Sequence, residues 1–325
     1  MSHADAEVAT KRREELGSER DAARAELIAG LSRPQPSIAP KYFYDALGSK
    51  LFEAICELDE YYLTRTEAAI FAQHAAAIAD SVGVGATLID LGAGNCAKAA
   101  GLFHVLQPQA YIPVDISEEF LHRAVEGLKK SYPHIPMHPV ALDFSDFLHL
   151  PAYVQERRKK LFFYPGSSLG NFTPLQAAQF LTRIRAACGG DGTLLLGIDL
   201  VKPAEELEAA YDDALGVTAA FNLNALRHIN LLLGSDFLLR DWQHKALFNA
   251  AQSRVEMYLR ARRDLTVTWP GGARAFGQGT AIHTENSYKY SCAAILDLLR
   301  QSGFGEARCW SDAEGRYLVC HARAT

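Results

Sequence analysis

Residues Leu88 to Lys98, LIDLGAGNCAK, form a glycine-rich motif whose spacing suits close contact between a backbone loop and a small molecule. An apolar run carries Asp90 near its end, and Gly92 and Gly94 follow where a helix would begin. The unpaired N–H groups at the N-terminus of that helix would face the ligand. The motif predicts a site for a nucleotide-like molecule, and a strand-to-helix turn without any ligand is the structural alternative.

The acidic residue before this loop separates two classes of ligand. The carboxylate of Asp90 would repel the pyrophosphate of a dinucleotide, whereas it would attract the ammonium group of S-adenosylmethionine (SAM). The loop by itself does not decide, because Ala97 stands where the looser dinucleotide pattern also tolerates alanine. We therefore expect SAM rather than NAD, with a nicotinamide-dependent oxidoreductase as the alternative.

Two further aspartates stand at the ends of the next two predicted strands, Asp115 in PVDIS and Asp143 in ALDFSD. The carboxyl ends of neighbouring strands in an open parallel sheet line one crevice, so both would lie near the glycine motif. Asp115 would accept hydrogen bonds from both ribose hydroxyls, and Asp143 from the adenine amino group, with Phe144 against the ring. Each aspartate alone is also typical of a helix N-cap or a turn. Their order after the glycine motif favours a cofactor site.

The fourth predicted strand ends in YPGSSLGNF, where small residues leave room for a ligand beside the backbone. Asn171 can both donate and accept hydrogen bonds, which suits a zwitterionic substrate. The alternative is a turn at Gly170 and Asn171, followed by an ordinary helix start at Thr173 and Pro174.

Composition excludes several classes of protein. The 325 residues suffice for about two domains. Lys and Arg number 33 against 38 Asp and Glu, a net charge of -5 that argues against a nucleic-acid partner. No apolar run approaches the length of a membrane span, and the first residues lack a signal-peptide pattern, so we expect a cytoplasmic protein without membrane contact. The six cysteines form no CxxC pair and no HExxH occurs, so no metal site is predicted.

Alternating apolar runs and helical segments after Thr66 are typical of βαβ units and a parallel sheet. An amphipathic helix from Ala4 to about Leu31 is predicted before them. Strands are predicted at Ala86–Gly92, Ala110–Ile116, Met137–Phe144, Lys160–Ser168 and Gly192–Leu200, and helices at Thr66–Ser81, Lys98–Leu106, Glu118–Tyr132 and Leu175–Cys188.

After Lys202 the pattern is mostly helical to about Ala246 and then strand-like, and a helix with two strand candidates follows Ser291. This predicts an α/β fold: a class I methyltransferase, Rossmann-like sheet with an inserted second substrate-binding domain, and a final strand that enters antiparallel. The predicted division is 1–65 for the N-terminal helix and part of the substrate domain, 66–201 for the SAM-binding domain, 202–289 for the substrate-binding insertion and 290–325 for the return to the sheet.

Several longer blocks carry a more specific signal than the glycine loop. They are FYDALGSKLFEAICELDEYYLTRTEA, DLGAGNCAK, PVDIS, GSSLGNFTP, LLLGIDLVK, YDDALGVTAAFNLN, VEMYLRAR and HTENSYKY, and they span almost the whole chain after the first helix and its proline-rich connector. Together they resemble the histidine-specific, SAM-dependent Nα-methyltransferases, which make trimethylhistidine (hercynine) in ergothioneine biosynthesis. Ordinary class I methyltransferases lack the blocks after LLLGIDLVK and around TENS.

The resemblance implies a role for each matching residue. The SAM-binding positions are Gly92, Lys98, Asp115, Asp143 and Phe144. Around the amino-acid substrate, Tyr61 and Asn171 would hold the α-carboxylate, Tyr44 would lie near the amine as the catalytic residue, Tyr211 would belong to the same pocket, and Glu285 and Ser287 would bind the imidazole beside Met257. Glu285 and Ser287 can reach one face if Ala281 to Ser287 is extended.

The chemistry of methyl transfer from a sulfonium needs neither a metal nor a covalent enzyme intermediate, only an uncharged amine held against the methyl group. An aromatic pocket beside the sulfonium would lower the pKa of the α-amine, so the Tyr44 hydroxyl, or a water it holds, would suffice to orient it. We expect a monomeric enzyme that methylates the α-amino group of L-histidine, up to three times. The alternatives are a methyltransferase of a related aromatic or polar amino acid, and a non-catalytic amino-acid-binding relative.

Overall fold

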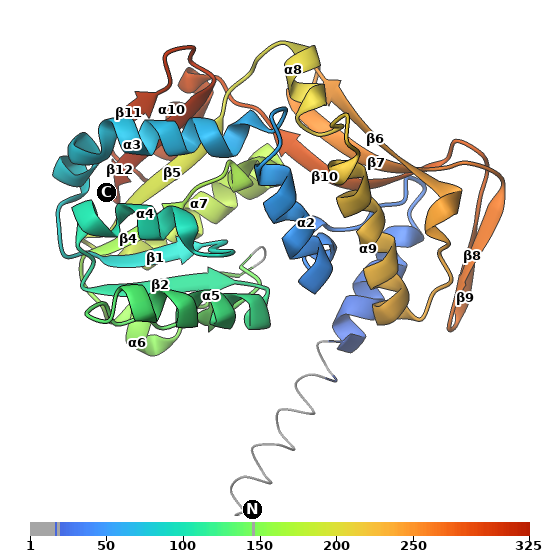
Figure 1. The fold of residues 1–325 in the computed structure, drawn as a ribbon, viewed down its shortest axis with the longest axis horizontal. Coiled ribbons are helices and arrows are strands. Elements are labelled where there is room, and N and C mark those ends of the chain that lie inside the picture. The colour runs from blue at the N-terminus through green and yellow to red at the C-terminus, as the bar shows by residue number, and fades with distance from the viewer. Residues whose placement is uncertain (1–16, 18–19, 145–146) are drawn as a thin grey trace, which may run out of the picture.

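The computed structural model describes residues 17, 20–144 and 147–325, and these residues form three β-sheets with their covering helices (Figure 1). The larger sheet has seven strands in the order β11-β12-β5-β4-β1-β2-β3. The smaller has three strands in the order β10-β7-β6, and β8 pairs with β9 as a separate two-stranded sheet.

The larger sheet is mainly parallel. Its parallel strands are β1 (Thr87–Leu91), β2 (Ala110–Asp115), β3 (Val140–Ala141), β4 (Lys160–Tyr164) and β5 (Thr193–Asp199). β12 (Tyr317–Arg323) pairs antiparallel with both β5 and β11 (Arg308–Ser311). β1, β4 and β5 are buried along their whole length, which explains why their sequences are continuous apolar runs. The expected α/β fold and the antiparallel final strand are confirmed.

Helices cover both faces of this sheet, and each face has its own apolar cluster. On one face lie α3 (Tyr62–Val82), α4 (Ala97–Leu106) and α5 (Glu118–Ser131), with Ile78, Leu102 and Leu121 buried against the strands. On the other lie α6 (Ala152–Gln155), α7 (Pro174–Cys188) and α10 (Cys292–Gln301), which bury Phe180 and Ile295. This three-layer arrangement leaves the carboxyl ends of the parallel strands free to carry a site.

The smaller part packs around a third cluster that includes Trp242, Leu259 and Phe276. Its strands are β6 (Trp242–Asn249), β7 (Arg254–Ala261), β8 (Leu265–Trp269), β9 (Gly272–Phe276) and β10 (Ala281–Tyr288). Its helical elements are residues 20–31, η1 (Pro40–Phe43), α2 (Ala46–Cys56), α8 (Ala204–Ala209), α9 (Val217–Leu233) and η3 (Leu239–Asp241). An N-terminal segment and a segment between β5 and α10 therefore build this part together, whereas the C-terminal strands β11 and β12 belong to the larger sheet (Figure 1).

Two predicted strands are shorter in the structure. The strand predicted at Met137–Phe144 contains only β3, because Pro139 has no backbone N–H to donate to a neighbouring strand. The strand predicted at Lys160–Ser168 ends at Tyr164. Pro165 follows, and Gly166 adopts a left-handed conformation with φ of 77°, which turns the chain out of the sheet.

The mostly helical stretch predicted from Lys202 to about Ala246 is wrong only in its last part, after Leu233. α9 ends at Leu233, and Gly234 follows as a left-handed C-cap with φ of 74°. The residues from Trp242 onward alternate between buried and exposed positions as β6, with Trp242 and His244 inside and Lys245 outside. A two-residue alternation governs this segment, not the helical period.

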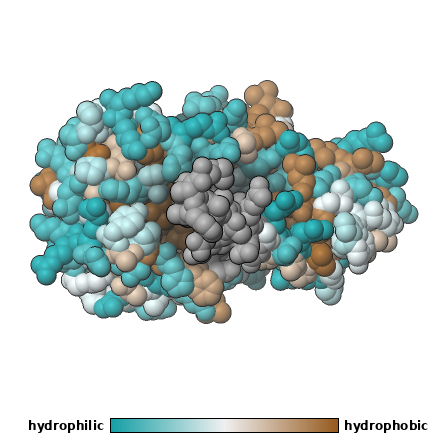
Figure 2. All heavy atoms as spheres, turned by 90° about the horizontal axis from the view of Figure 1, so that it is seen from below, coloured by the Kyte–Doolittle hydropathy of each residue, from teal (hydrophilic) through white to brown (hydrophobic). Residues whose placement is uncertain are grey.

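Three further predictions concern the first helix, membrane contact and the division of the chain into domains. Residues 17 and 20–31 are helical, and the rest of the predicted first helix lies outside the described residues. Among the described helices, none is long and apolar enough to span a membrane. The face of the molecule in Figure 2 is mainly hydrophilic. The division of the chain into four segments stays a prediction.

Candidate active site

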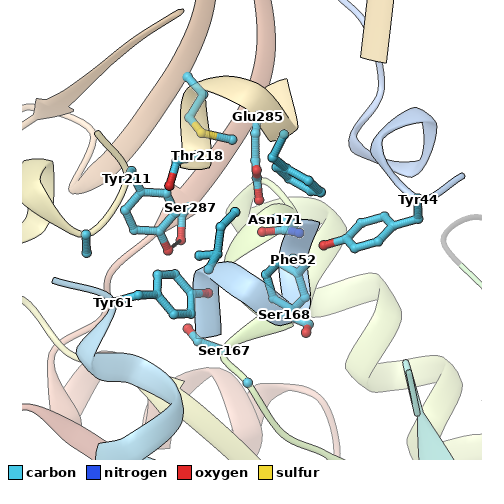
Figure 3. A pocket seen from close by; sticks show the side chains of 15 residues that line it. Tyr44, Phe52, Tyr61, Ser167, Ser168, Asn171, Tyr211, Thr218, Glu285 and Ser287 are labelled. Carbon is cyan, nitrogen blue, oxygen red and sulfur yellow. Dashed lines mark hydrogen bonds between the residues drawn. The ribbon is translucent and has the colours of Figure 1, made fainter. Parts of the chain in front are cut away.

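A cavity of about 510 Å³, counting its open mouth, lies between the carboxyl end of β4 and the smaller sheet (Figure 3). Every residue that the sequence assigns to catalysis or substrate binding lines it: Tyr44, Tyr61, Asn171, Tyr211, Met257, Glu285 and Ser287. Segments far apart in the sequence therefore meet at one place. Phe52 and Phe221 line the cavity as well, and the sequence analysis did not single them out.

Close packing of two backbone segments positions the polar residues of the cavity. Asn171 lies on η2 (Ser168–Asn171), directly after β4, while Glu285 and Ser287 lie on β10. η2 and β10 approach so closely that a Cβ atom on Gly170 would lie 2.8 Å from the carbonyl oxygen of Tyr288. Gly170 is therefore required by this contact, which explains the small residues that follow β4.

Aromatic rings form one side of the cavity. The ring centroid of Tyr44 lies 5.8 Å from that of Phe52 and 5.7 Å from that of Phe221, and Phe52 lies 6.1 Å from Tyr61. Ser117 donates a hydrogen bond to the Tyr44 carbonyl at 3.1 Å, so the segment after β2 holds Tyr44 in place. Burial raises the pKa of the Tyr44 hydroxyl well above its usual value, so it is a neutral phenol.

Glu285 points into the cavity and lies beside Asn171 (Figure 3). With its amide nitrogen turned toward acceptors, Asn171 donates to Oε1 of Glu285 at 3.1 Å and to the carbonyl of Asn286 at 3.2 Å. Burial raises the pKa of Glu285 to about 7, and the nearby Lys289 opposes this shift. Besides the hydrogen bond from Asn171, the carboxyl oxygens of Glu285 have further acceptor positions, which are available to a polar ligand in the cavity.

Glu285→Gln is expected to stabilise the ligand-free protein at pH 8 by about 2 kcal/mol more than at pH 5. The folded-state pKa of about 7 exceeds the ordinary value of 4.5, so ionisation of Glu285 destabilises the folded protein as the pH rises between these values. The magnitude follows from ~1.4 kcal/mol per pKa unit. Urea unfolding at both pH values measures the effect, and a pH-independent difference between variant and wild type would contradict the burial argument.

A buried polar corner, formed by Tyr211, Ser287, Lys289 and Asp199, closes the cavity on the side of Ser287. The Tyr211 and Ser287 hydroxyl oxygens are 2.7 Å apart, and Lys289 donates to both of them. Lys289 also pairs with Asp199 of β5 at 2.7 Å. Neither Lys289 nor Asp199 was predicted from the sequence. The available signal was the alternation along β10, which places position 289 on the same side of the strand as 285 and 287.

The predicted SAM crevice would lie at the glycine motif, at the carboxyl end of β1, and several features there suit the cofactor. Gly92 has φ of 73°, and a Cβ atom there would lie 3.8 Å from Cζ of Phe144, so the loop and this ring face each other. Asp90 is buried, its Oδ2 accepts from Tyr111 at 2.7 Å, and its Oδ1 has no partner among the described residues. An unpaired buried carboxylate oxygen suits the ammonium group of SAM.

Asp115 connects the two loops of this crevice. Its Oδ2 accepts the Gly94 N–H and its Oδ1 accepts the Ser117 N–H, both at 2.9 Å. Each carboxylate oxygen has a second acceptor position, so the side chain can also receive two ribose hydroxyls.

The other two predicted cofactor residues form ion pairs in the structure. Lys98 pairs with the buried Glu67 at 2.6 Å, and Asp143 pairs with Lys41 at 3.1 Å. The Lys98 ammonium lies 3.1 Å from where a Cβ atom on Gly166 would be, and Gly166 lines the cavity. The crevice and the cavity are therefore neighbours. No group of side chains in the described part of the chain could hold a metal ion.

Comparison with known proteins identifies the family. The model of the histidine-specific, SAM-dependent methyltransferase family matches residues 23–324. Histidine N-alpha-methyltransferase of Mycolicibacterium smegmatis is 37% identical over 303 residues, which cover 91% of this chain and 93% of that protein. The protein of the same name from Mycobacterium tuberculosis is 36% identical over 309 residues, with 91% and 93% covered. Ergothioneine biosynthesis protein 1 of Neurospora crassa is 30% identical over 292 residues, which cover 86% of this chain and 32% of that protein.

These matches extend over both the SAM crevice and the cavity, including the blocks that build the smaller sheet. The expected cofactor, SAM, is the one that the family description names. The chain is an enzyme, and it belongs to the family of histidine-specific, SAM-dependent methyltransferases.

Proposed function

We propose that this enzyme transfers methyl groups from SAM to the α-amino group of L-histidine and repeats the transfer until trimethylhistidine is formed. The observation that carries the proposal is the pairing of a partly buried carboxyl group, Glu285, with a buried hydroxyl, Ser287, in a cavity that also has an aromatic wall and lies next to the SAM crevice. An imidazole ring has one N–H donor and one nitrogen acceptor, which this pair can satisfy together. The histidine relatives support the same substrate.

The substrate would be held at both ends. Glu285 and Ser287 bind the ring, Met257 packs beside it, and Tyr61 and Asn171 bind the α-carboxylate. Because the ring and the carboxylate are both anchored, the α-amine has few positions available, and the reaction gains from this loss of freedom. We place SAM on Gly92, Lys98, Asp115, Asp143 and Phe144, where its sulfonium supplies an electrophilic methyl group.

The amine must lose a proton before it can attack. An α-amine has an ordinary pKa of about 8, and the aromatic, water-poor wall formed by Tyr44, Phe52 and Phe221 disfavours its charged form. No strong base is then required. The neutral Tyr44 phenol accepts a hydrogen bond from the amine, orients its lone pair and passes the proton outward through water.

Trimethylhistidine is expected as the end product when SAM is in excess. The growing ammonium group remains cationic, and the faces of Tyr44 and Tyr61 can attract it by cation–π interaction while the ring and the carboxylate stay bound. Mass spectrometry of a histidine reaction over time should show the mono- and dimethyl species rise and then disappear. Accumulation of the monomethyl species with unused SAM would contradict repeated methylation.

Phe52→Leu offers a matched test of the aromatic wall, because it keeps an apolar side chain but removes the ring that packs against Tyr44 and Tyr61. We expect it to slow the third transfer more than the first. A uniform decrease in all three steps would show that the wall does not distinguish the growing cation.

A further inference from the structure

Lys289 is a fully buried lysine directly behind the cavity, and all of its donor capacity is used. Its ammonium nitrogen lies 2.7 Å from Oδ2 of Asp199, 3.0 Å from the Tyr211 hydroxyl and 2.9 Å from the Ser287 hydroxyl. A lysine ammonium has three N–H donors and no acceptor. Each proton therefore has one partner, and Lys289 keeps none for a substrate.

These contacts determine whether the Ser287 hydroxyl donates or accepts a hydrogen bond toward the cavity. The Ser287 and Tyr211 oxygens are 2.7 Å apart, so one hydroxyl donates to the other. A phenol is the stronger acid and hence the better donor, and the Lys289 ammonium, 4.7 Å from the centre of the Tyr211 ring, strengthens this tendency. Tyr211 therefore donates to Ser287. Both lone pairs of Ser287 are then occupied, one by Tyr211 and one by Lys289, and only its own O–H is left for a ligand in the cavity that Ser287 lines.

We propose that Lys289 is a specificity-determining positioning residue, which fixes the Ser287 hydroxyl as a donor and thereby makes the cavity select the neutral form of the substrate imidazole. This inference rests on histidine being the substrate. A neutral ring offers an unprotonated nitrogen to Ser287 and an N–H to Glu285. An imidazolium ring carries N–H groups on both nitrogens, so one of them would meet the Ser287 donor without an acceptor.

The charges around the corner agree with a neutral ring. Asp199 of β5 faces both Lys289 and Lys202, which lies 2.6 Å from its other oxygen. Glu285 is the other acid that faces the ring. With Glu285 ionised, two acids and two lysines balance, and with Glu285 protonated, which its raised pKa of about 7 favours at lower pH, the two lysines exceed Asp199 and disfavour an imidazolium. The titratable tyrosines packed around this group, Tyr44, Tyr61, Tyr62 and Tyr211, have pKa values raised by burial and stay neutral.

The pH dependence of substrate preference tests this selection. L-Histidine is compared with 1,2,4-triazolylalanine, whose ring has a similar shape, an N–H and acceptor nitrogens, but takes up a proton only in strong acid. Titration of Glu285 and of the enzyme in general affects both substrates, so the ratio of their kcat/KM values reports the imidazole alone. We expect the ratio, histidine over triazolylalanine, to be constant above the imidazole pKa of about 6.5 and to fall about tenfold for each pH unit below it.

Three variants connect the selection to Lys289. Lys289→Met frees a lone pair on Ser287, whereas Ser287→Ala removes the hydroxyl donor but keeps the lysine charge. In both variants we expect the ratio of kcat/KM values, histidine over triazolylalanine, to change less than about threefold between pH 5 and pH 6.5. Lys202→Met is the matched control, because it also removes a lysine from Asp199 but does not contact Ser287. It should keep the wild-type slope. Circular dichroism and thermal unfolding establish that each variant folds.

The possible results distinguish a failure of the inference about Lys289 from a failure of the proposed function. A pH-independent ratio in the wild type, with histidine still methylated, overturns the inference and leaves the proposed function intact. A wild-type slope in Ser287→Ala also overturns it, because the charge of Lys289 would then act without the hydroxyl. If Lys289→Met does not fold, the wild type and Ser287→Ala still decide. Failure to methylate histidine at any pH refutes the proposed function itself.

Discussion

Glu285→Ala is expected to lower kcat/KM for histidine by one to three orders of magnitude and to relax the preference toward phenylalanine and tryptophan. Removal of a buried hydrogen-bond partner leaves the ring N–H unpaired in a water-poor cavity, at a cost of about 1.5–4 kcal/mol in transition-state binding. An apolar aromatic ring has no such group to lose. The relaxation should be larger when Met257, which lines the same cavity, is also shortened.

Competition among the three amino acids, with methylated products counted by mass spectrometry, measures this change. Glu256→Ala is the matched control: Glu256 is a buried glutamate of the same sheet, it lies on β7 opposite Asn286, and its side chain accepts hydrogen bonds from Arg254 and Tyr258 outside the cavity. This control should keep the preference for histidine. If Glu285→Ala also keeps it, Glu285 does not recognise the imidazole.

Asp115→Ala is expected to weaken SAM binding about 10- to 150-fold, which corresponds to roughly 1.5–3 kcal/mol for hydrogen bonds to a charged acceptor. The variant loses the proposed ribose acceptors and also the two N–H contacts that connect the loops at Gly94 and Ser117. Calorimetric titration of SAM into the folded variant gives the affinity.

Asp115→Asn separates these two contributions, because its amide oxygen can still accept one of the loop N–H groups while the charge is lost. We expect it to weaken SAM binding by a smaller factor than Asp115→Ala. An unchanged affinity in both variants would remove Asp115 from the cofactor site.

The fold was largely predictable because its signals are local. Continuous apolar runs predict the buried strands β1, β4 and β5, and helical periods predict the helices between them. The predictions were wrong where two local signals competed. Apolar residues around Met137 and Val140 indicated a longer strand, but Pro139 interrupts it, and the helical pattern of α9 was extended into β6 past the C-cap at Gly234.

The residues assigned to substrate binding came mainly from the family resemblance, and the structure brings all of them to one cavity. Their assignment as binding residues stays a prediction. No sequence signal indicated Lys289, because a lone lysine at a strand end is usually exposed. Its burial depends on the ion pair with Asp199, which comes from a distant part of the chain. The ion pairs Lys98–Glu67 and Lys41–Asp143 are equally non-local, so no sequence pattern indicates them.

The atom of histidine that receives the methyl group distinguishes α-amine methylation from any other reaction of this enzyme. The pure enzyme is incubated with L-histidine and SAM that carries an isotopically labelled methyl group, and tandem mass spectrometry locates the label in the product. We expect all of the label on the α-amino nitrogen of histidine, with up to three methyl groups on that atom. Label on an imidazole nitrogen, or no label on histidine while another amino acid is methylated, would contradict it.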